Sequence, residues 1–303
     1  MDIKYYQSLF ESYLLTEKRV TQNTFTAYQT DINQFCAYLE ESKLSFATAK
    51  EVDLKVYVRS MHKKKLSART LSRKISSLKL LYGFLFERHQ LENAAKGLVF
   101  PKVEKTLPTY LSEHEVVTLL DAARKDESPK GVRNLVMIHL LYAAGMRISE
   151  LTNLTLDQFH FDTGFLTVSG KGNKQRDVPL PQKVLQTVSY YLDVIYPRLV
   201  PAEYLSKSKP YLFCTVRNGK LAPLTRQSFW VILRRLLVAS KIKKKVSPHT
   251  LRHSLATHLM GAGADIRSLQ LLLGHEQINT VEIYTHLESK QLRKIYDNKH
   301  PRA

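Results

Sequence analysis

The chain has 303 residues, enough for two domains that each bury a hydrophobic core. Hydrophobic residues make up 44% of it and charged residues 24%, which is the composition of a soluble globular protein. The formal net charge of +19 indicates a polyanionic partner and favours nucleic acid. A basic protein without a nucleic-acid role is the alternative.

No segment of the sequence is suited to crossing a membrane. The longest apolar run, residues 135–146, has 12 residues and is too short to span a bilayer. The N-terminus has no apolar signal-peptide core, and the basic residues are spread over the chain, which argues against an anionic membrane surface as the partner. Cys36 and Cys214 have neither metal-ligand spacing nor the pattern of a disulfide framework. We therefore expect a cytoplasmic protein.

Residues 1–100 have the periodicity of a helical domain. One helix is predicted over residues 25–39, with Asn23 or Thr24 as its N-cap. A shorter helix follows, whose apolar residues are Val52, Val56 and Met61. Ser67 caps a longer helix with the apolar stripe Leu71, Ile75, Leu78, Tyr82 and Leu85.

Basic side chains are concentrated between and within the last two of these helices. They are Lys63, Lys64, Lys65, Arg69, Arg73 and Lys74. A run of charge is often only a solvated helix face. Because the whole chain has an excess of positive charge, we favour a surface that follows the phosphates of DNA.

Residues 101–110 contain two prolines and mixed charges, and we interpret them as a linker. They separate a first domain at residues 1–100 from a second at residues 111–303. Ser112 and Glu115 have the spacing of a capping box at the start of the second domain's first helix.

The apolar residues 135–144 predict a buried central helix that ends at Gly145. Arg147 follows directly, in the stretch Gly-Met-Arg-Ile-Ser-Glu-Leu. A rigidly held arginine suits a catalytic site. A structural ion pair with Glu150 is the alternative, and both roles are compatible because Glu150 would then orient the site.

Two β-rich runs, residues 165–168 and 177–180, enclose a basic, turn-rich loop and predict a hairpin. Lys171 lies between two glycines of this loop, where the backbone allows close approach to a ligand. The loop lacks the spacing of a nucleotide-binding Walker motif. Lys174 and Arg176 are further candidate DNA contacts in the same hairpin. Beyond it we expect helices at 182–195 and 226–239 and a short strand at 211–213.

Pro248 suits the first position of a helix whose buried stripe contains leucines at 251, 255 and 259. His249 and Arg252 are three residues apart and share a face near the start of this helix. Positive groups at the positive end of a helix dipole indicate an anion site, and a phosphate would fit. A capping or core histidine and a surface arginine are the alternatives. Leu-Gly-His follows at 273–275, and Tyr284 lies nine residues after His275.

The order of these motifs resembles the tyrosine recombinase (phage integrase) family, and most closely its bacterial Xer recombinases. The similar stretches are residues 145–151, 170–174, 249–259, 271–275 and 281–286, and the resemblance covers nearly the whole chain. It implies a mainly α fold, with an N-terminal four-helix core-binding (SAM-like) domain. The C-terminal catalytic domain would be mixed α/β and mostly helical, with a small antiparallel β-sheet.

The resemblance also implies cleavage and rejoining of DNA through a covalent 3′-phosphotyrosine. Tyr284 resembles the nucleophile, and Arg147 and Arg252 the guanidinium groups that hold the non-bridging oxygens. Lys171 resembles the general acid for the leaving 5′-oxygen. No metal ion, nucleotide or other cofactor is required, because the phosphotyrosine conserves the bond energy.

Two histidines complete the implied catalytic set. His249 resembles the general base or hydrogen-bonding partner, and His275 a second phosphate ligand. The implied substrate is double-stranded DNA with a dif-like site. On two such sites, a homotetramer or a heterotetramer with a paralogous Xer protein would form, with a DNA translocase as an activator.

Resolution of chromosome dimers is the first hypothesis for the biological role. An integrase of a mobile element, a DNA-relaxing enzyme similar to type IB topoisomerases, and a catalytically silent DNA-binding relative are the alternatives.

Overall fold

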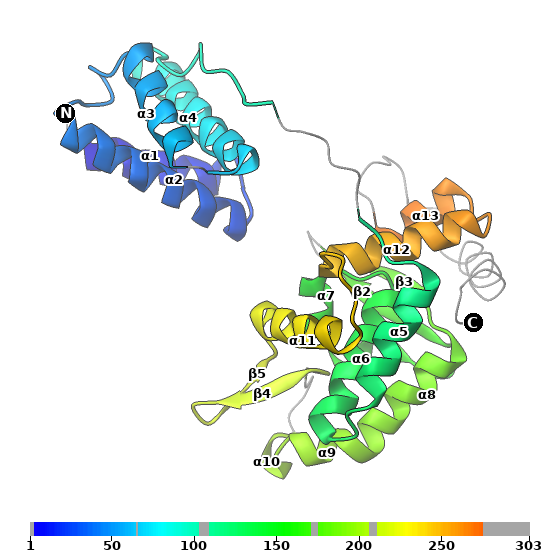
Figure 1. The fold of residues 1–303 in the computed structure, drawn as a ribbon. Helices are drawn as coiled ribbons and strands as arrows, with labels where there is room; N and C mark the ends of the chain where they lie inside the picture. Colours follow the sequence, from blue (N-terminus) through cyan, green and yellow to red (C-terminus); the bar gives the residue numbers. More distant parts are fainter. Residues whose placement is uncertain (1–2, 65, 103–108, 171–174, 206–210, 275–303) are drawn as a thin grey trace. The chain divides into compact units, whose positions relative to one another are not determined.

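The structure, a computed structural model, describes residues 3–64, 66–102, 109–170, 175–205 and 211–274. The chain divides into two compact units, Met1–Thr106 and Leu107–Ala303 (Figure 1). Five residues that the sequence singled out lie outside the described part of the chain, namely Lys65, Lys171, Lys174, His275 and Tyr284. Within the described ranges, no helix is both long and apolar enough to span a membrane.

The described part of the first unit is built from four helices, as expected. They are α1 (Ile3–Thr16), α2 (Gln22–Glu41), α3 (Glu51–Lys63) and α4 (Ala68–His89). Their inward faces form one core in which aromatic rings predominate. Phe35 of α2 lies at its centre, with ring centroids 5.1 Å from Tyr57 and 6.2 Å from Tyr82.

The start of α2 differs from the prediction. Thr21, not Asn23 or Thr24, is the N-cap, and its Oγ1 accepts a hydrogen bond from the Thr24 amide at 3.4 Å. The helix therefore begins one turn before its first large apolar residue. Ser67 is the cap predicted for α4, since its Oγ accepts from the Thr70 amide at 3.1 Å.

The buried face of α3 differs in part from the prediction, although Met61 is buried as expected. Val52 and Val56 are 69% and 48% exposed, whereas Leu54 and Tyr57 are buried. Tyr57 packs against aromatic rings of α2 and buries more apolar surface than a valine, so it decides which face turns inward.

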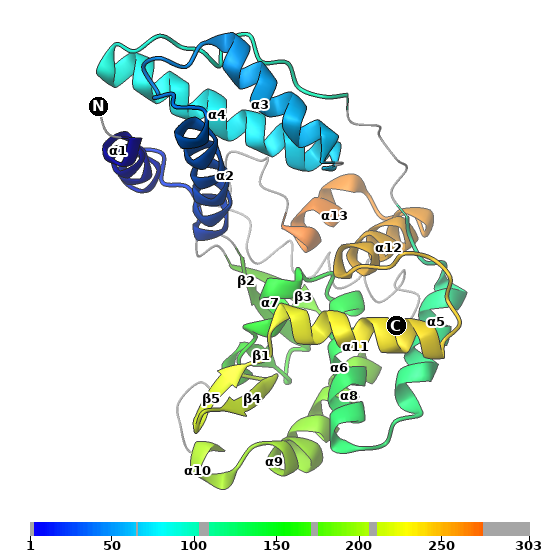
Figure 2. The same ribbon diagram turned by 60° about the vertical axis from the view of Figure 1, so that its left-hand side comes forward.

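The second unit is organised around one buried helix. The α-helices of its described part are α5 (Glu113–Arg124), α6 (Pro129–Ala143), α7 (Ile148–Thr152), α8 (Gln182–Tyr190), α9 (Tyr196–Leu199), α10 (Ala202–Leu205), α11 (Arg226–Ala239), α12 (Pro248–Gly261) and α13 (Ile266–Leu273). Helix α6 is the predicted central helix and contacts α5, α8 and α12. In Figures 1 and 2, α12, α13 and α7 lie at one end of this unit, and α9 and α10 lie at the other.

A three-stranded antiparallel sheet contains the predicted hairpin. Its strands are β1 (Phe159–His160), β2 (Phe165–Ser169) and β3 (Gln175–Pro179), in the order β1-β2-β3. Leu166 pairs with Val178, and Val168 pairs with Arg176. The side chains of β2 alternate, so Leu166 and Val168 face the core. The hairpin expectation is confirmed.

A second hairpin was not predicted. Strands β4 (Cys214–Arg217) and β5 (Lys220–Pro223) pair around Asn218 and Gly219, both of which have positive φ, 48° and 66°. Asn-Gly is the usual signal for such a two-residue turn. The strand expected at 211–213 is absent from the described structure there: Tyr211 forms only an isolated bridge with Thr155. The helix expected over 182–195 ends as α8 at Tyr190 and continues as a π-helical turn, Tyr191–Ile195.

Candidate active site

Helix α12 carries Arg252 into the site, and local sequence fixes where this helix begins. Ser247 Oγ accepts a hydrogen bond from the Thr250 amide at 3.1 Å, and Pro248 occupies the first helical position. The predicted leucine stripe is buried against the core. Arg252 lies beside this stripe and is only 7% exposed.

The buried guanidinium of Arg252 connects two distant backbone segments. Its Nη1 donates to the Gly145 carbonyl at 2.5 Å, and its Nη2 donates to the Leu273 carbonyl. Burial, together with the nearby positive charges of Arg147 and Arg176, lowers the pKa of Arg252 to about 10. Since this value is well above 7, Arg252 remains a cation at neutral pH.

Arg147 lies just beyond α6, where Gly145 reverses the chain with φ of +55°. Its Nη1 donates to Glu150 Oε1 at 2.8 Å, and its amide donates to Glu150 Oε2 at 2.8 Å. Its Nη2 donates to the Gly274 carbonyl at 3.2 Å. The side chain is 35% exposed, so a ligand has access to it. The ion pair with Glu150 therefore exists, and it holds an accessible arginine.

Arg176 shares the same carboxylate from the opposite direction. From β3, its Nη2 lies 2.8 Å from Glu150 Oε2, and its Nε donates to the Leu272 carbonyl at 2.9 Å. Burial on its own would raise the pKa of Glu150, but hydrogen bonds and charge from Arg176 and Arg147 lower it below its ordinary value. The Arg176 side chain is only 12% exposed. Arg176, a candidate DNA contact from its sequence, thus has Glu150 and the Leu272 carbonyl as partners in the structure.

The three arginines meet at the C-terminus of α13. The last carbonyls of a helix lack intrahelical donors and carry partial negative charge. Here the carbonyls of Leu272, Leu273 and Gly274 each accept from a different arginine, located on β3, on α12 and before α7. The structure thus brings Arg147 and Arg252 together, as the sequence predicted, and adds Arg176. His275 is the next residue in the chain.

His249 lies in the first turn of α12 and is exposed. Arg252, three residues later, is buried, so the two side chains differ in their access to solvent although they are close in sequence. An exposed imidazole beside a helix N-terminus is accessible to an anionic ligand.

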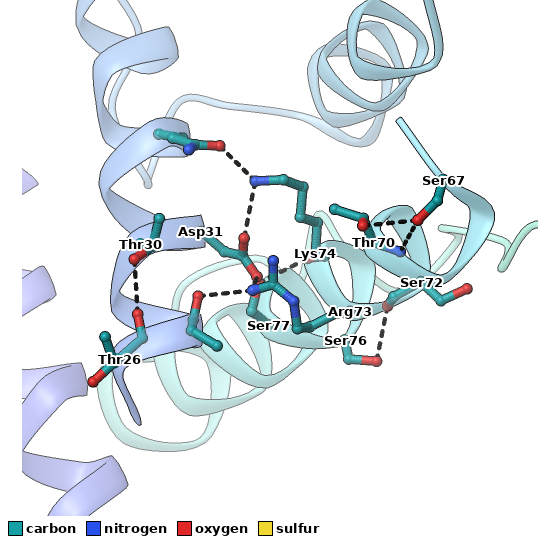
Figure 3. Close-up of polar contacts among 12 residues, drawn as sticks. Thr26, Thr30, Asp31, Ser67, Thr70, Ser72, Arg73, Lys74, Ser76 and Ser77 are labelled. Atoms are coloured by element: carbon teal, nitrogen blue, oxygen red, sulfur yellow. Dashed lines mark hydrogen bonds and ion pairs between the residues drawn. The ribbon is translucent and has the colours of Figure 1, made fainter. Parts of the chain in front are cut away.

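The basic residues of the first unit divide into two groups. Lys63, Lys64 and Arg69 are exposed, as a phosphate-binding surface requires. Arg73 instead donates through Nη1 to Asp31 and, at 2.9 Å, to the Ala27 carbonyl. Figure 3 shows Asp31 of α2 held between Arg73 and Lys74 of α4. Arg73 therefore has a structural partner that the sequence interpretation did not include, and its side chain is 38% exposed.

From the sequence, Glu150 was expected to pair with Arg147 alone, but in the structure it also pairs with Arg176. Its place three residues after Arg147 is a local signal, because that spacing lets a side chain reach back to a helix start. The role of Arg176 had no such signal. Its partners Glu150 and Leu272 are 26 and 96 residues away in sequence.

Both units match known protein families. Residues 109–291 match the phage integrase family, and residues 8–89 match the phage integrase N-terminal SAM-like domain. The tyrosine recombinase XerD of Chlorobaculum tepidum is 36% identical over 297 residues, which cover 97% of this chain and 95% of that protein. The tyrosine recombinase XerD of Staphylococcus saprophyticus is 36% identical over 301 residues, covering 98% of this chain and 99% of the relative.

A solved structure has the same fold. It is the XerH site-specific recombinase bound to a palindromic difH substrate in a post-cleavage complex. The two chains superpose with a TM-score of 0.68 at 25% identity, covering 95% of this chain and 83% of that one.

Proposed function

The chain belongs to the phage integrase family of tyrosine recombinases, and we propose that it resolves chromosome dimers by recombining two dif-like DNA sites. As a member of this family, it is a site-specific recombinase that breaks and rejoins DNA. Two observations support the finer assignment: relatives that cover nearly the whole chain are XerD recombinases, and the similar XerH was solved with a difH substrate.

One observation supports the catalytic roles proposed for Arg147 and Arg252. The guanidinium groups of Arg147 and Arg252, from different elements, converge on consecutive carbonyls immediately before His275. A scissile phosphate bound there meets two forked cations, which suit the non-bridging oxygens on which charge concentrates during phosphoryl transfer. The positive end of α12 with His249 adds a further donor.

The reaction then proceeds by exchange at phosphorus. The Tyr284 hydroxyl oxygen forms a bond to the scissile phosphorus, and the bond from phosphorus to the 5′-oxygen breaks. His249 takes or shares the phenolic proton, Lys171 supplies a proton to the 5′-oxygen, and His275 donates to the phosphate. A 5′-hydroxyl from the partner DNA reverses these steps and releases the tyrosine. Because the phosphotyrosine conserves the bond energy, the exchange uses neither ATP nor a metal ion.

We also infer the assembly in which this happens. Residues 1–100 bind DNA, residues 101–110 link them to the catalytic residues 111–303, and four protomers act on two sites in the cytoplasm. The protomers are identical or include a paralogous Xer protein, and a DNA translocase activates the complex.

The test is a nicked suicide duplex that carries a candidate dif-like site. Wild-type protein should produce a protease-sensitive, slowly migrating DNA band on a denaturing gel, in the presence of EDTA and without ATP. Tyr284→Phe should bind the same duplex and give no such band. Binding by both proteins without any covalent product, even after a paralogue is added, would support the catalytically silent alternative.

Supercoiled plasmids with zero, one or two candidate sites separate the remaining functions. Recombinant products that require two sites support the recombinase. Relaxation of the plasmid without a site would support the topoisomerase-like alternative.

A further inference from the structure

Arg176 occupies a place that the proposed catalytic set does not explain. We propose that Arg176 is a positioning residue: it locks Glu150 and the C-terminus of α13 together, and so fixes the orientation in which Arg147 meets the scissile phosphate. This inference rests on the function proposed above and assigns Arg176 no contact with DNA.

The bonds of Arg176 link three elements that are separate in sequence. Both oxygens of Glu150 accept from its terminal nitrogens, at 3.2 Å to Nη1 and 2.8 Å to Nη2. Its Nε donates at 2.9 Å to the Leu272 carbonyl. A single planar group thus joins β3, α7 and α13. A lysine cannot reproduce this, because its ammonium is a single point donor rather than a fork.

Glu150 transmits this order to Arg147. The same carboxylate oxygens that accept from Arg176 also accept from the Arg147 amide and from Arg147 Nη1, both at 2.8 Å. With Glu150 oriented on one side by Arg176, the Arg147 guanidinium has a defined plane. Without Arg176, the carboxylate keeps its bonds to Arg147 but loses its connection to β3, so the accessible arginine loses that reference.

Close packing at Gly274 supports a built arrangement rather than a chance contact. A Cβ added at Gly274 would lie 3.2 Å from Arg176 Cδ and 3.3 Å from its Nη1, and Gly274 has φ of +64°. The Arg176 side chain therefore lies against bare backbone at the end of α13. Fixing this turn also fixes the point from which the chain continues to His275.

The carboxylate partner of Arg176 argues against direct DNA binding. Both terminal nitrogens of Arg176 donate to Glu150, whereas those of Arg252, which is also buried, donate to backbone carbonyls. The Arg176 side chain is 12% exposed, compared with 35% for Arg147. All three of its nitrogens already donate to protein oxygens. A DNA phosphate would have to displace Glu150 or Leu272 to reach it, which costs the buried hydrogen bonds.

The experiment compares Arg176→Ala and Arg176→Lys with wild type on the suicide duplex. Cleavage is measured in single turnover at saturating DNA, and DNA affinity is measured separately across a salt series. We expect Arg176→Ala to cleave about 100-fold more slowly, as a small misplacement near reacting groups produces, with DNA affinity within about twofold. Arg176→Lys should recover only part of the rate. If the alanine variant does not fold, the lysine variant carries the test.

The pH dependence gives a readout that a purely structural role would not change. The charged groups near Glu150 are Arg147 from its own turn, Arg176 from β3 and, by charge interaction, Arg252 from α12. Loss of Arg176 removes a cation that lowers the Glu150 pKa. The acid limb of the cleavage rate should therefore move to higher pH in Arg176→Ala. It should not move in that way when Glu150→Gln is added, because no carboxyl remains to titrate.

Arg124→Ala is the matched control, because Arg124 is an exposed arginine of the same unit paired with Asp121. Equal cleavage by Arg176→Ala and Arg124→Ala would overturn the positioning role and leave the recombinase function intact. Weaker, less salt-dependent binding with an unchanged rate at saturation would also overturn it, since Arg176 would then be a DNA contact. If wild type forms no phosphotyrosine, the proposed function fails, and the positioning role fails with it.

Discussion

The Glu150 carboxylate balances the positive charge of two guanidinium groups. Its ionisation therefore affects the stability of the fold as well as the site. Both carboxylate oxygens accept from Arg147 and Arg176, and the side chain is 5% exposed. Hydrogen bonds to charged groups of this kind contribute about 1.5–3 kcal/mol each when buried. A change at this single position therefore affects both neighbouring arginines.

We predict that Glu150→Gln lowers the free energy of unfolding by about 2 kcal/mol at pH 7. The folded-state pKa of Glu150 lies below its ordinary value of 4.5, so the carboxylate's contribution is complete above about pH 4.5 and is lost as the pH falls through the folded value. The difference from wild type should shrink below that pH. Urea unfolding at several pH values checks this, with the exposed Glu127→Gln as control. A difference that does not change with pH would contradict it.

Arg252, one of the two arginines proposed to hold the scissile phosphate, is not interchangeable with lysine. Arg252 reaches the carbonyls of Gly145 and Leu273 with different nitrogens, which a lysine cannot do simultaneously. We expect Arg252→Lys to reduce single-turnover cleavage of the suicide duplex by about 100- to 1000-fold. DNA affinity should change little. Arg124→Lys is the control, because Arg124 makes none of these contacts, and it should cleave as fast as wild type. A cleavage rate of Arg252→Lys equal to that of wild type would refute the role proposed for Arg252.

Short-range chemistry directs where individual helices begin. Ser112 and Glu115 form the predicted capping box of α5, and Ser247 caps α12. The cap of α2 is Thr21, which lies before the residues that the sequence interpretation chose. A polar residue near the expected start is therefore not sufficient to identify a cap, because several neighbouring threonines and asparagines qualify.

Thr21→Ala should destabilise the first unit by about 1 kcal/mol, because it leaves the Thr24 amide without its cap. Asn23→Ala is the control: Asn23 is exposed inside the first turn, and we expect a change within about 0.5 kcal/mol. Denaturant unfolding of both full-length variants measures the difference. The reverse order would mean that α2 begins later in solution.

The end of α6 depends on a residue that has no side chain. Gly145 has φ of +55°, and a Cβ there would lie 2.7 Å from Leu273 Cδ2. We predict that Gly145→Ala costs about 1–2 kcal/mol, from the left-handed backbone conformation alone. Cleavage should also slow, because the Gly145 carbonyl accepts from Arg252. Thermal unfolding of the variants measures the change in stability. Gly261→Ala is the control, because a Cβ at this helical glycine has no neighbour within 4 Å, and it should be neutral or stabilising.

Across the whole molecule, the net charge of +19 favours binding to DNA phosphates irrespective of base sequence. If Lys63, Lys64 and Arg69 each neutralise a phosphate, replacing all three with glutamine should reduce the slope of log affinity against log salt by about 3. Titrations at several salt concentrations measure this slope.

Lys18→Gln with Arg88→Gln is the control for that titration. Arg69 and Arg88 lie near opposite ends of the 22-residue helix α4, about 28 Å apart along its axis. The control should change the slope by less than one. An equal loss per charge in both variants would mean that the basic surface is diffuse.

Much of the fold follows from contacts that are short in sequence. The leucines at 251, 255 and 259 share a helix face, and their burial in α12 was predictable from spacing alone. The hairpin of β2 and β3 followed from alternation and turn residues. The hairpin at Asn218 and Gly219 had an equally local signal that the interpretation missed.

The sequence by itself determined the family and the order of its motifs, because both depend on the identity and spacing of the motif residues. It also determined most helix positions, because these depend on residues three or four apart. Only the tertiary structure decided which partners each arginine has. Arg252 and Gly145 are 107 residues apart, and Arg147 and Gly274 are 127 apart. No local pattern records such partners. Whether a guanidinium faces solvent or already donates to a carboxylate and to the end of a helix depends on how the chain packs, and this packing places Arg176 against Glu150 and the Leu272 carbonyl.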